Sequence, residues 1–486
     1  MPRFRSVGVW LRQMPGRFRS APIQPYPPHS ITTIPEPMRP TSRRSFLRTV
    51  SAAGTAAGLG FPAITRSANP NSKLGLAGIG GGGGKGESDL AAAAEGNTVV
   101  AICDTDRTRL AAALKKYNLP ADKGFTDFRK MLDTVKEIDA CTVSTADHAH
   151  YPAAMHAMGL DKHVCVQKPL TNTLWEAQQL GLAAAKKKVV TGMGNQGHTG
   201  EGMRLCKEWI QQGAIGTIKE IHVWTNRPIW PQGNGAKFET GKATPDTLDW
   251  EAWQAGNPLV GYTDGLHPFA WRGHTLYGAG AMGDMGCHLL DGPFWALDLH
   301  KSIMKDIIKV EVDAEEAGET HWPKASTIKV HFPDVVLTWY DGGRKPAKPP
   351  QLEESRNLSD GGFFVIGDKG AIYDQSDYCQ SPRLIPETSH KDWIAKGPKK
   401  TLERSTHPGN PQAEWTHAIK NGLPCPSSFE YSVPLTYLCL LGNLAISAGK
   451  TIEFDPNKLE VVGMPEAKKF IKRTYREGWE YSADKI

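Results

Sequence analysis

Three side chains have the types and the spacing that proton transfer requires: Lys168, Asp284 and His288. Lys168 follows an apolar run that ends at Val166. This position is typical of a lysine at the end of a buried strand and not of a solvated surface lysine. Asp284 and His288 are four residues apart in a segment of small residues, so a helix would place them on one face. Alone, Asp284 could equally cap that helix and His288 could fill a core position. With Lys168 upstream, the three residues favour an acid–base group.

A glycine-rich turn upstream predicts a dinucleotide site. The apolar run 74–79 leads into Gly78, Ile79 and Gly80, and Gly83 completes a G-x-G-x-x-G pattern before an Ala-rich segment that should be helical from 88 to 95. Such glycines permit a tight turn and let the backbone approach a pyrophosphate at the helix N-terminus. A flexible glycine-rich loop would have the same sequence pattern, so the flanking segments must decide between a loop and a dinucleotide site.

That context is a second apolar strand, 98–103, which ends at Asp104. Asp104 lies 21 residues after Gly83, where an acid binds the adenosine ribose. The order of strand, glycines, helix, strand and acid favours a Rossmann domain. The acid favours NAD over NADP, and Arg107 close by leaves NADP open.

Strand and helix patterns then alternate up to residue 197, which predicts a doubly wound parallel sheet with its ligand at the carboxyl ends of the strands. Strands are expected at 138–144, 163–166 and 189–193, and helices at 110–117, after 125–128, at 151–158 and at 174–186.

The first 68 residues are expected to be a leader. Residues 42–48, Ser-Arg-Arg-Ser-Phe-Leu-Arg, precede a weakly apolar stretch and resemble a twin-arginine export signal, whose translocation machinery carries folded proteins out of the cytoplasm. Met38 is a possible true start. Residues 1–70 hold ten arginines, no lysine and one acid, so the rest of the chain carries −3 of the net +6. A body with that charge has no excess of positive charge for nucleic acid.

The motifs together resemble the glucose–fructose oxidoreductase/inositol dehydrogenase (Gfo/Idh/MocA) family over roughly residues 73–480. The resemblance rests on the glycine turn, Asp104, the segments 144–150 and 192–196, and Gln167-Lys168-Pro169, where the family more often has Glu-Lys-Pro. The change to Gln167 removes a charge. The resemblance implies cofactor contacts at Gly78, Ile79, Gly80, Gly83, Asp104, Ser144, Thr145, His148, His150, Gln167, Lys168 and Asn195.

The resemblance also implies a role for each acid–base residue. Lys168 would be a general acid/base beside the nicotinamide, and His288 would take the hydroxyl proton as hydride leaves the same carbon. Asp284 would orient His288 or bind a neighbouring hydroxyl. The implied activity is NAD-dependent oxidation or reduction at a secondary hydroxyl or ketone of a sugar, inositol or sugar acid.

The chain is expected to divide into a Rossmann domain, 73–197, and a C-terminal α+β domain, 198–486. The resemblance implies that the second domain has an open, mainly antiparallel sheet that forms the far wall of the substrate pocket and often the interface of a homo-oligomer. Alternating strand patterns begin at 218, 326 and 335, while 343–360 and 380–408 should be long loops. The five tryptophans of 224–274, with Arg272 and His274, favour a sugar-like ligand as a group, although each one alone is more often a core residue.

Three alternatives stay open. An NAD-dependent glycosidase of the same superfamily would oxidise, eliminate and reduce again, but the resemblance implies that such enzymes lack the lysine that Lys168 supplies. A non-catalytic sugar- or nucleotide-binding protein would need none of the acid–base residues. His148 and His150 could bind a metal, but no third ligand has suitable spacing. Because free NAD is scarce outside the cytoplasm, an exported protein of this kind should carry its cofactor tightly bound.

Overall fold

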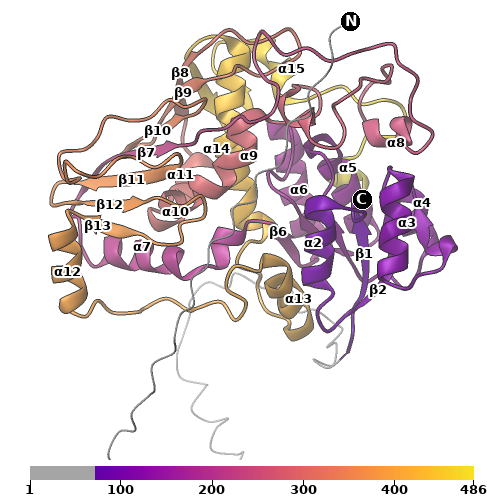
Figure 1. Ribbon diagram of the computed structural model, residues 1–486, viewed down its shortest axis with the longest axis horizontal. Helices are drawn as coiled ribbons and strands as arrows, with labels where there is room; N and C mark the ends of the chain where they lie inside the picture. The colour runs from indigo at the N-terminus through magenta and orange to yellow at the C-terminus, as the bar shows by residue number, and fades with distance from the viewer. Residues whose placement is uncertain (1–71) are drawn as a thin grey trace, which may run out of the picture. The chain divides into compact units, whose positions relative to one another are not determined.

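The computed structural model describes residues 72–486, which belong to one unit (Figure 1). The expected leader, 1–68, with its arginine pair and Met38, lies outside the described residues.

The first region is a parallel six-stranded sheet, in agreement with the predicted Rossmann fold. Its strand order is β3-β2-β1-β4-β5-β6. The strands are added on one side of β1 up to β3 and on its other side from β4 onward, so the topological switch point, where doubly wound sheets bind their ligands, lies between β1 and β4. The strands are β1 (Gly75–Ile79), β2 (Thr98–Cys103), β3 (Gly124–Phe125), β4 (Ala140–Val143), β5 (His163–Val166) and β6 (Thr191–Met193). The helices between them are α2 (Gly84–Ala93), α3 (Arg107–Lys116), α4 (Phe128–Thr134), α5 (Asp147–Gly159) and α6 (Leu174–Lys187).

The second region is built on a mixed, mostly antiparallel sheet of nine strands, also as expected. Its order is β13-β12-β11-β7-β10-β9-β8-β14-β15, and the pairing of β7 with β10 is parallel. The strands are β7 (Ile218–Trp224), β8 (Ile308–Ala314), β9 (Ser326–His331), β10 (Val336–Tyr340), β11 (Gly362–Gly367), β12 (Ala371–Asp374), β13 (Arg383–Ile385), β14 (Ile452–Asp455) and β15 (Glu460–Val461).

Helices join the two sheets. The apolar helix α14 (Phe429–Ala448) packs against α6 of the first region and against α9 (Gly280–Leu289) and β8 of the second. Figure 1 shows α14 in yellow between the two sheets. Its length and composition would suit a membrane span, but 83% of its most apolar window is buried inside the protein. The helices of this region are α7 (Glu201–Gln211), α8 (Trp250–Gln254), α9 (Gly280–Leu289), α10 (Asp291–Ala296), α11 (Leu299–Ile303), α12 (Glu387–Ala395), α13 (Pro411–Asn421), α14 (Phe429–Ala448) and α15 (Lys468–Ile471).

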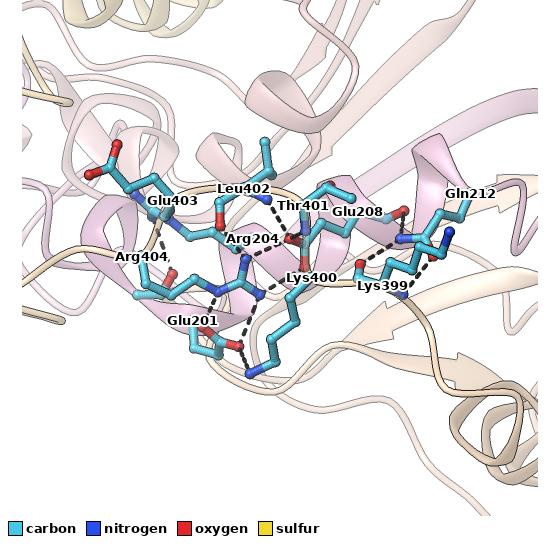
Figure 2. Close-up of polar contacts among 11 residues, drawn as sticks. Glu201, Arg204, Glu208, Gln212, Lys399, Lys400, Thr401, Leu402, Glu403 and Arg404 are labelled. Carbon is cyan, nitrogen blue, oxygen red and sulfur yellow. Dashed lines mark hydrogen bonds and ion pairs between the residues drawn. The ribbon is translucent and has the colours of Figure 1, made fainter. Parts of the chain in front are cut away.

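The expected loop 380–408 is only partly a loop, because it contains β13 and α12. The rest of it is fixed to α7 by an ion network (Figure 2). The Arg404 guanidinium lies between Glu201 and Glu208, and the Glu208 carboxylate also accepts hydrogen bonds from the backbone N–H groups of Thr401 (2.6 Å) and Leu402 (2.8 Å). Glu208 is buried, so loss of Arg404 would leave an unpaired buried charge, at a cost of about 3–5 kcal/mol.

Two segments of the expected second domain pack on the Rossmann region instead. Helix α13 contacts α2, and its Trp415 indole N–H donates to the carbonyl of Val190. At the C-terminus, the Tyr151 hydroxyl of α5 donates to the carbonyl of Tyr481. The two regions therefore share a boundary that the chain crosses several times.

Candidate active site

A cavity of about 540 Å³ lies at the carboxyl ends of β1, β2, β4 and β5 and is closed by residues of the second region. We call its two ends the Asp104 end, with Asp104, Arg109 and Trp479, and the Lys168 end, with Lys168 and His288. Its lining includes most of the sequence-predicted residues: Ile79, Gly80, Gly83, Asp104, Ser144, Thr145, His148, His150, Gln167, Lys168, Asp284 and His288. Gly78 and Asn195 are not among the lining residues.

The glycine turn provides a cradle for a dinucleotide. Gly80 has φ +74°, a left-handed conformation that favours glycine, and leads from β1 into α2. A Cβ at Gly86 would lie 1.9 Å from the Gly80 carbonyl oxygen, so Gly86 makes the close contact between helix and turn. Gly83 precedes the first turn of α2 and lines the cavity, where the free N–H groups of a helix N-terminus suit a pyrophosphate.

Asp104 is held at the end of β2 by backbone groups. Its carboxylate accepts hydrogen bonds from the N–H groups of Gly82 (2.8 Å) and Asp106 (3.0 Å), and burial raises its pKa. Arg107 points elsewhere, because it pairs with Asp249 at 3.5 Å. The cation that lines the cavity beside Asp104 is Arg109.

Segments of the second region cover the Asp104 end. The N–H of Arg107 donates to the carbonyl of Thr247 (2.8 Å), and the N–H of Asp249 donates to the carbonyl of Thr105 (2.9 Å). Trp479, from the C-terminal tail, lines the cavity with its ring 3.9 Å from the Arg129 guanidinium. The end of the cavity next to Asp104 is thus bordered by a backbone-paired segment and by an aromatic ring.

His148 and His150 line the cavity, and each has a ring nitrogen within hydrogen-bond distance of a backbone carbonyl oxygen. His148 Nε2 lies 2.7 Å from the carbonyl oxygen of Trp253, and His150 Nδ1 lies 2.9 Å from that of Pro169. Burial lowers the pKa of His148 to about 3 and that of His150 to about 4, so both rings are neutral. In residues 72–486, no group of three or more His, Cys, Asp or Glu side chains is placed to hold a metal.

Gln167 donates to a buried carboxylate. Its Nε2 lies 2.7 Å from Oδ2 of Asp89, which also accepts from the Ser144 hydroxyl (2.8 Å) and, through Oδ1, from Gln412 Nε2 (2.8 Å). Asp89 is 1% exposed and is paired with Lys85 as well. An amide therefore suits position 167 better than the family's glutamate, because a glutamate would face the carboxylate of Asp89 directly.

Lys168 and Asp284 form an ion pair at the other end of the cavity. Lys168 Nζ donates to Asp284 Oδ1 at 3.0 Å and to the Asp284 carbonyl oxygen at 2.6 Å, and Arg272 Nε donates to the same Oδ1 at 3.0 Å. Burial alone would raise the pKa of Asp284, but Lys168 and Arg272 outweigh it and hold that pKa well below its usual range. Asp284 is therefore a permanent anion that orients two cations, and it is not the cap of α9, whose first residue follows Ala279.

His288 is held by Asn195 and not by Asp284. His288 Nδ1 lies 2.8 Å from Asn195 Oδ1, and both side chains are buried. Burial, followed by the charge of Lys168, lowers the pKa of His288 well below its ordinary value. The neutral imidazole can accept a proton from a group in the cavity.

Sequence reasoning missed Asp147, although it lies inside the motif 144–150. Asp147 lines the cavity at the start of α5 and accepts a hydrogen bond from the Ala279 N–H at 3.0 Å. Burial raises its pKa to about 7 against the opposing charges of Lys168 and Arg272. No spacing rule would have identified it, because two of the groups around it, Arg272 and the Ala279 N–H, are more than a hundred residues away.

The tryptophan cluster divides between core and cavity. Trp253 and Trp271 line the cavity together with Arg272, whereas Trp224 is fully buried beneath the second sheet. The Trp271 ring lies against the Arg272 guanidinium, which pairs with Asp284, and an aromatic face beside a guanidinium can receive a polyhydroxylated ring.

Two family descriptions match this chain. Residues 72–195 match the NAD-binding Rossmann fold of the Gfo/Idh/MocA oxidoreductases, and residues 217–481 match the C-terminal alpha/beta domain of the same family.

Individual relatives match only part of this chain, and at low sequence identity. An inositol 2-dehydrogenase of Salmonella typhimurium is 30% identical over 31% of this chain and 44% of its own length. A glycosyl hydrolase family 109 protein of Parabacteroides distasonis is 33% identical over 29% of this chain and 34% of its own length. The chain thus spans less than half the length of each of these two relatives.

Among solved structures, the WlbA dehydrogenase of Bordetella pertussis in complex with NADH and UDP-GlcNAcA has a TM-score of 0.55 at 16% identity, covering 79% of this chain and 99% of that one. At that identity the likeness shows the fold. The glycine cradle, the acid after β2 and the two matched domains agree with one another, and the chain belongs to the Gfo/Idh/MocA family of NAD-binding oxidoreductases.

Proposed function

We propose that this chain moves hydride between NAD and a secondary hydroxyl or ketone of a sugar, inositol or sugar acid, and that it keeps NAD tightly bound. The observation that carries the proposal is the convergence of Lys168, Asp284 and His288 on one end of a cavity whose other end fits a dinucleotide. The names of the relatives, inositol 2-dehydrogenase among them, support a polyol or sugar.

The residues at the Lys168 end supply the proton chemistry. NAD, when bound, would supply the hydride acceptor for oxidation of the carbinol carbon and the hydride donor for the reverse reaction. His288 accepts the hydroxyl proton as the C–H bond breaks, and gives it back to the carbonyl oxygen in reduction. Two of the three Nζ protons of Lys168 are used by Asp284, and the third can bind the same substrate oxygen.

The cover over the Asp104 end supports tight retention of the cofactor. An adenosine moiety bound there would lie beside Thr105, whose segment is paired with 247–249, and beside Trp479, so we expect these contacts to oppose its release. We propose that NAD is loaded in the cytoplasm and that the twin-arginine machinery exports the folded protein to the periplasm or cell-envelope space. NAD is regenerated there without leaving the protein, by a second substrate or by an internally redox-neutral cycle.

The test begins with the purified full-length protein. Denaturation should release NAD in a ratio near one per chain, and a panel of sugars, inositols and sugar acids added to the intact protein should change its absorbance in the reduced-nicotinamide band. Lys168→Ala and His288→Ala should each abolish most of that change while keeping the nucleotide. Unchanged turnover in both variants, or a protein that binds no dinucleotide, would rule the proposal out.

The glycosidase relative defines the competing outcome. If NAD is bound but the net reaction with an aryl glycoside is hydrolysis without a change of redox state, the oxidation–elimination–reduction cycle replaces the proposed reaction.

A further inference from the structure

A chain of buried polar groups extends from His288 into the protein, away from the cavity. Asn195 Oδ1 faces His288 Nδ1 at 2.8 Å, and Asn195 Nδ2 donates to the Cys287 carbonyl oxygen (2.7 Å) and to Asp291 Oδ2 (2.8 Å). Asn195 is 1% exposed and Asp291 is fully buried.

Asp291 is itself fixed by other donors. His198 Nδ1 lies 3.1 Å from both carboxylate oxygens, and the Tyr431 hydroxyl donates to Oδ1. The carboxylate therefore has donors from three side chains, and every one of them is buried. Such a satisfied network holds its members in one arrangement.

The chemistry of these partners decides which way the Asn195 amide points. A carboxylate and a backbone carbonyl are acceptors only, so both require the NH₂ group of Asn195. With the amide reversed, Oδ1 would face two other acceptors in a buried site, which is strongly unfavourable. The oxygen must therefore face His288.

The orientation of Asn195 in turn decides which nitrogen of His288 carries the proton. An amide oxygen accepts only, so Nδ1 of the neutral ring must be the protonated nitrogen. Nε2 is then bare, and the ring to which it belongs lines the cavity and has no hydrogen bond to Nε2 among residues 72–486.

We infer that Asn195 is a positioning residue that fixes His288 in the Nδ1–H tautomer and so presents the Nε2 lone pair to the substrate hydroxyl. This inference rests on the proposed function for the role of His288 in turnover, but the tautomer itself does not. It also gives Asn195 a role different from the cofactor contact that the sequence suggested.

The first test is ¹⁵N NMR of the histidine-labelled full chain at neutral pH, with the His288 signals assigned by their loss in His288→Gln. The wild type should show a protonated Nδ1 and an unprotonated Nε2. Asn195→Leu should show a large fraction of the Nε2–H form. Asn195→Asp, whose protonated acid can donate to Asp291 and still accept from His288, should restore the Nδ1–H form.

Asn443→Leu is the matched control. Asn443 is a buried asparagine whose Nδ2 donates to the Ala279 carbonyl at the start of α9, so its loss removes a similar hydrogen bond without touching His288. The control should keep the wild-type tautomer. A wild type protonated on Nε2, or an Asn195→Leu protein with the wild-type tautomer, would overturn the inference, and the wild-type spectrum decides even if Asn195→Leu does not fold.

The second test is kinetic and uses a substrate found in the sugar panel. Asn195→Leu should lower kcat by about 10- to 100-fold, with KM within about threefold of wild type, because only the base is affected. Asn443→Leu should stay within about threefold in kcat. Turnover by Asn195→Leu equal to the control would contradict the inference. If the wild type turns over no substrate, the proposed function fails while the NMR result still stands on its own.

Discussion

At the Asp104 end of the cavity the carboxylate of Asp104 is held by backbone N–H groups, whereas at the Lys168 end the carboxylate of Asp284 is held by two charged side chains. Asp104 accepts from two backbone N–H groups, and the segments above it pair through their main chains. Lys168, Arg272 and Asp284 instead hold one another through charge. Backbone hydrogen bonds suit the end of the cavity that binds the cofactor, and charged side chains with exchangeable protons suit the end where proton transfer is expected.

The comparison predicts that a change at the Lys168 end affects turnover and leaves cofactor binding intact. His288→Gln should lower kcat by about 10²- to 10⁴-fold, because a positioned acid–base group contributes that much. Single-turnover reduction of bound NAD measures the effect, and the nucleotide content of the purified variant is the control. A variant that loses its NAD in proportion to its activity would show that the two ends are not separable.

Gln167→Glu tests the network between the two ends. It would place a second carboxylate against Asp89 Oδ2, where Gln167 Nε2 now lies at 2.7 Å, and should lower the free energy of unfolding by about 2–3 kcal/mol at neutral pH. The loss should shrink as the pH falls, because the two acids can then share a proton. Urea unfolding at pH 5 and pH 8 measures it. Asp89→Asn combined with Gln167→Glu should recover most of the stability, and no recovery would exclude this cause.

A change at the Asp104 end should have the opposite effect to that of His288→Gln. Asp104→Ala removes the acceptor of the Gly82 N–H and should weaken NAD binding by about tenfold, or about 1.4 kcal/mol. Calorimetric titration of the stripped protein measures this, and kcat at saturating NAD should stay within about threefold. An equal loss in kcat at saturation would place Asp104 in the reaction itself.

The smallest expected effect is the pH dependence that Asp147 confers on stability. Because its pKa is raised from 3.8 to about 7 by burial, its contribution is fully present below pH 3.8 and is lost as the pH rises to about 7. Asp147→Asn should remove this decline, whose slope for a single titrating group is at most about 1.4 kcal/mol per pH unit. Unfolding curves between pH 4 and pH 8 compare the two proteins. An identical pH dependence would show that Asp147 does not titrate in this range.

Local patterns allowed much of the site to be predicted. The glycine turn, Asp104 and the pair Asp284 and His288 depend on residues within one turn, strand or helix, and the structure brings them to one cavity. The helix α12 was missed because it has no buried residue, so it leaves no apolar period in the sequence. The strand β3 is too short to show an alternation.

The remaining parts of the site depend on contacts between distant residues. Asn195 and His288 are 93 residues apart, and Gln412 and Asp89 are 323 apart, so no spacing links them. Asn195 was assigned to the cofactor on the family resemblance of its motif, whereas only the packing of α9 shows that its oxygen faces a histidine. Charge partners of this kind are specified by tertiary packing, which a local pattern does not encode.

The return of α13 and of the C-terminal tail to the Rossmann region has a consequence for the order of synthesis. The Tyr151 hydroxyl bonds a carbonyl 330 residues later, and Trp479 forms part of the cavity wall. A ribosome makes the six-stranded sheet long before it makes Gln412 or Trp479, so the nascent chain has the glycine turn without its far supports. The pocket is therefore completed only after Trp479 has emerged, and contacts of such long range make that step slow.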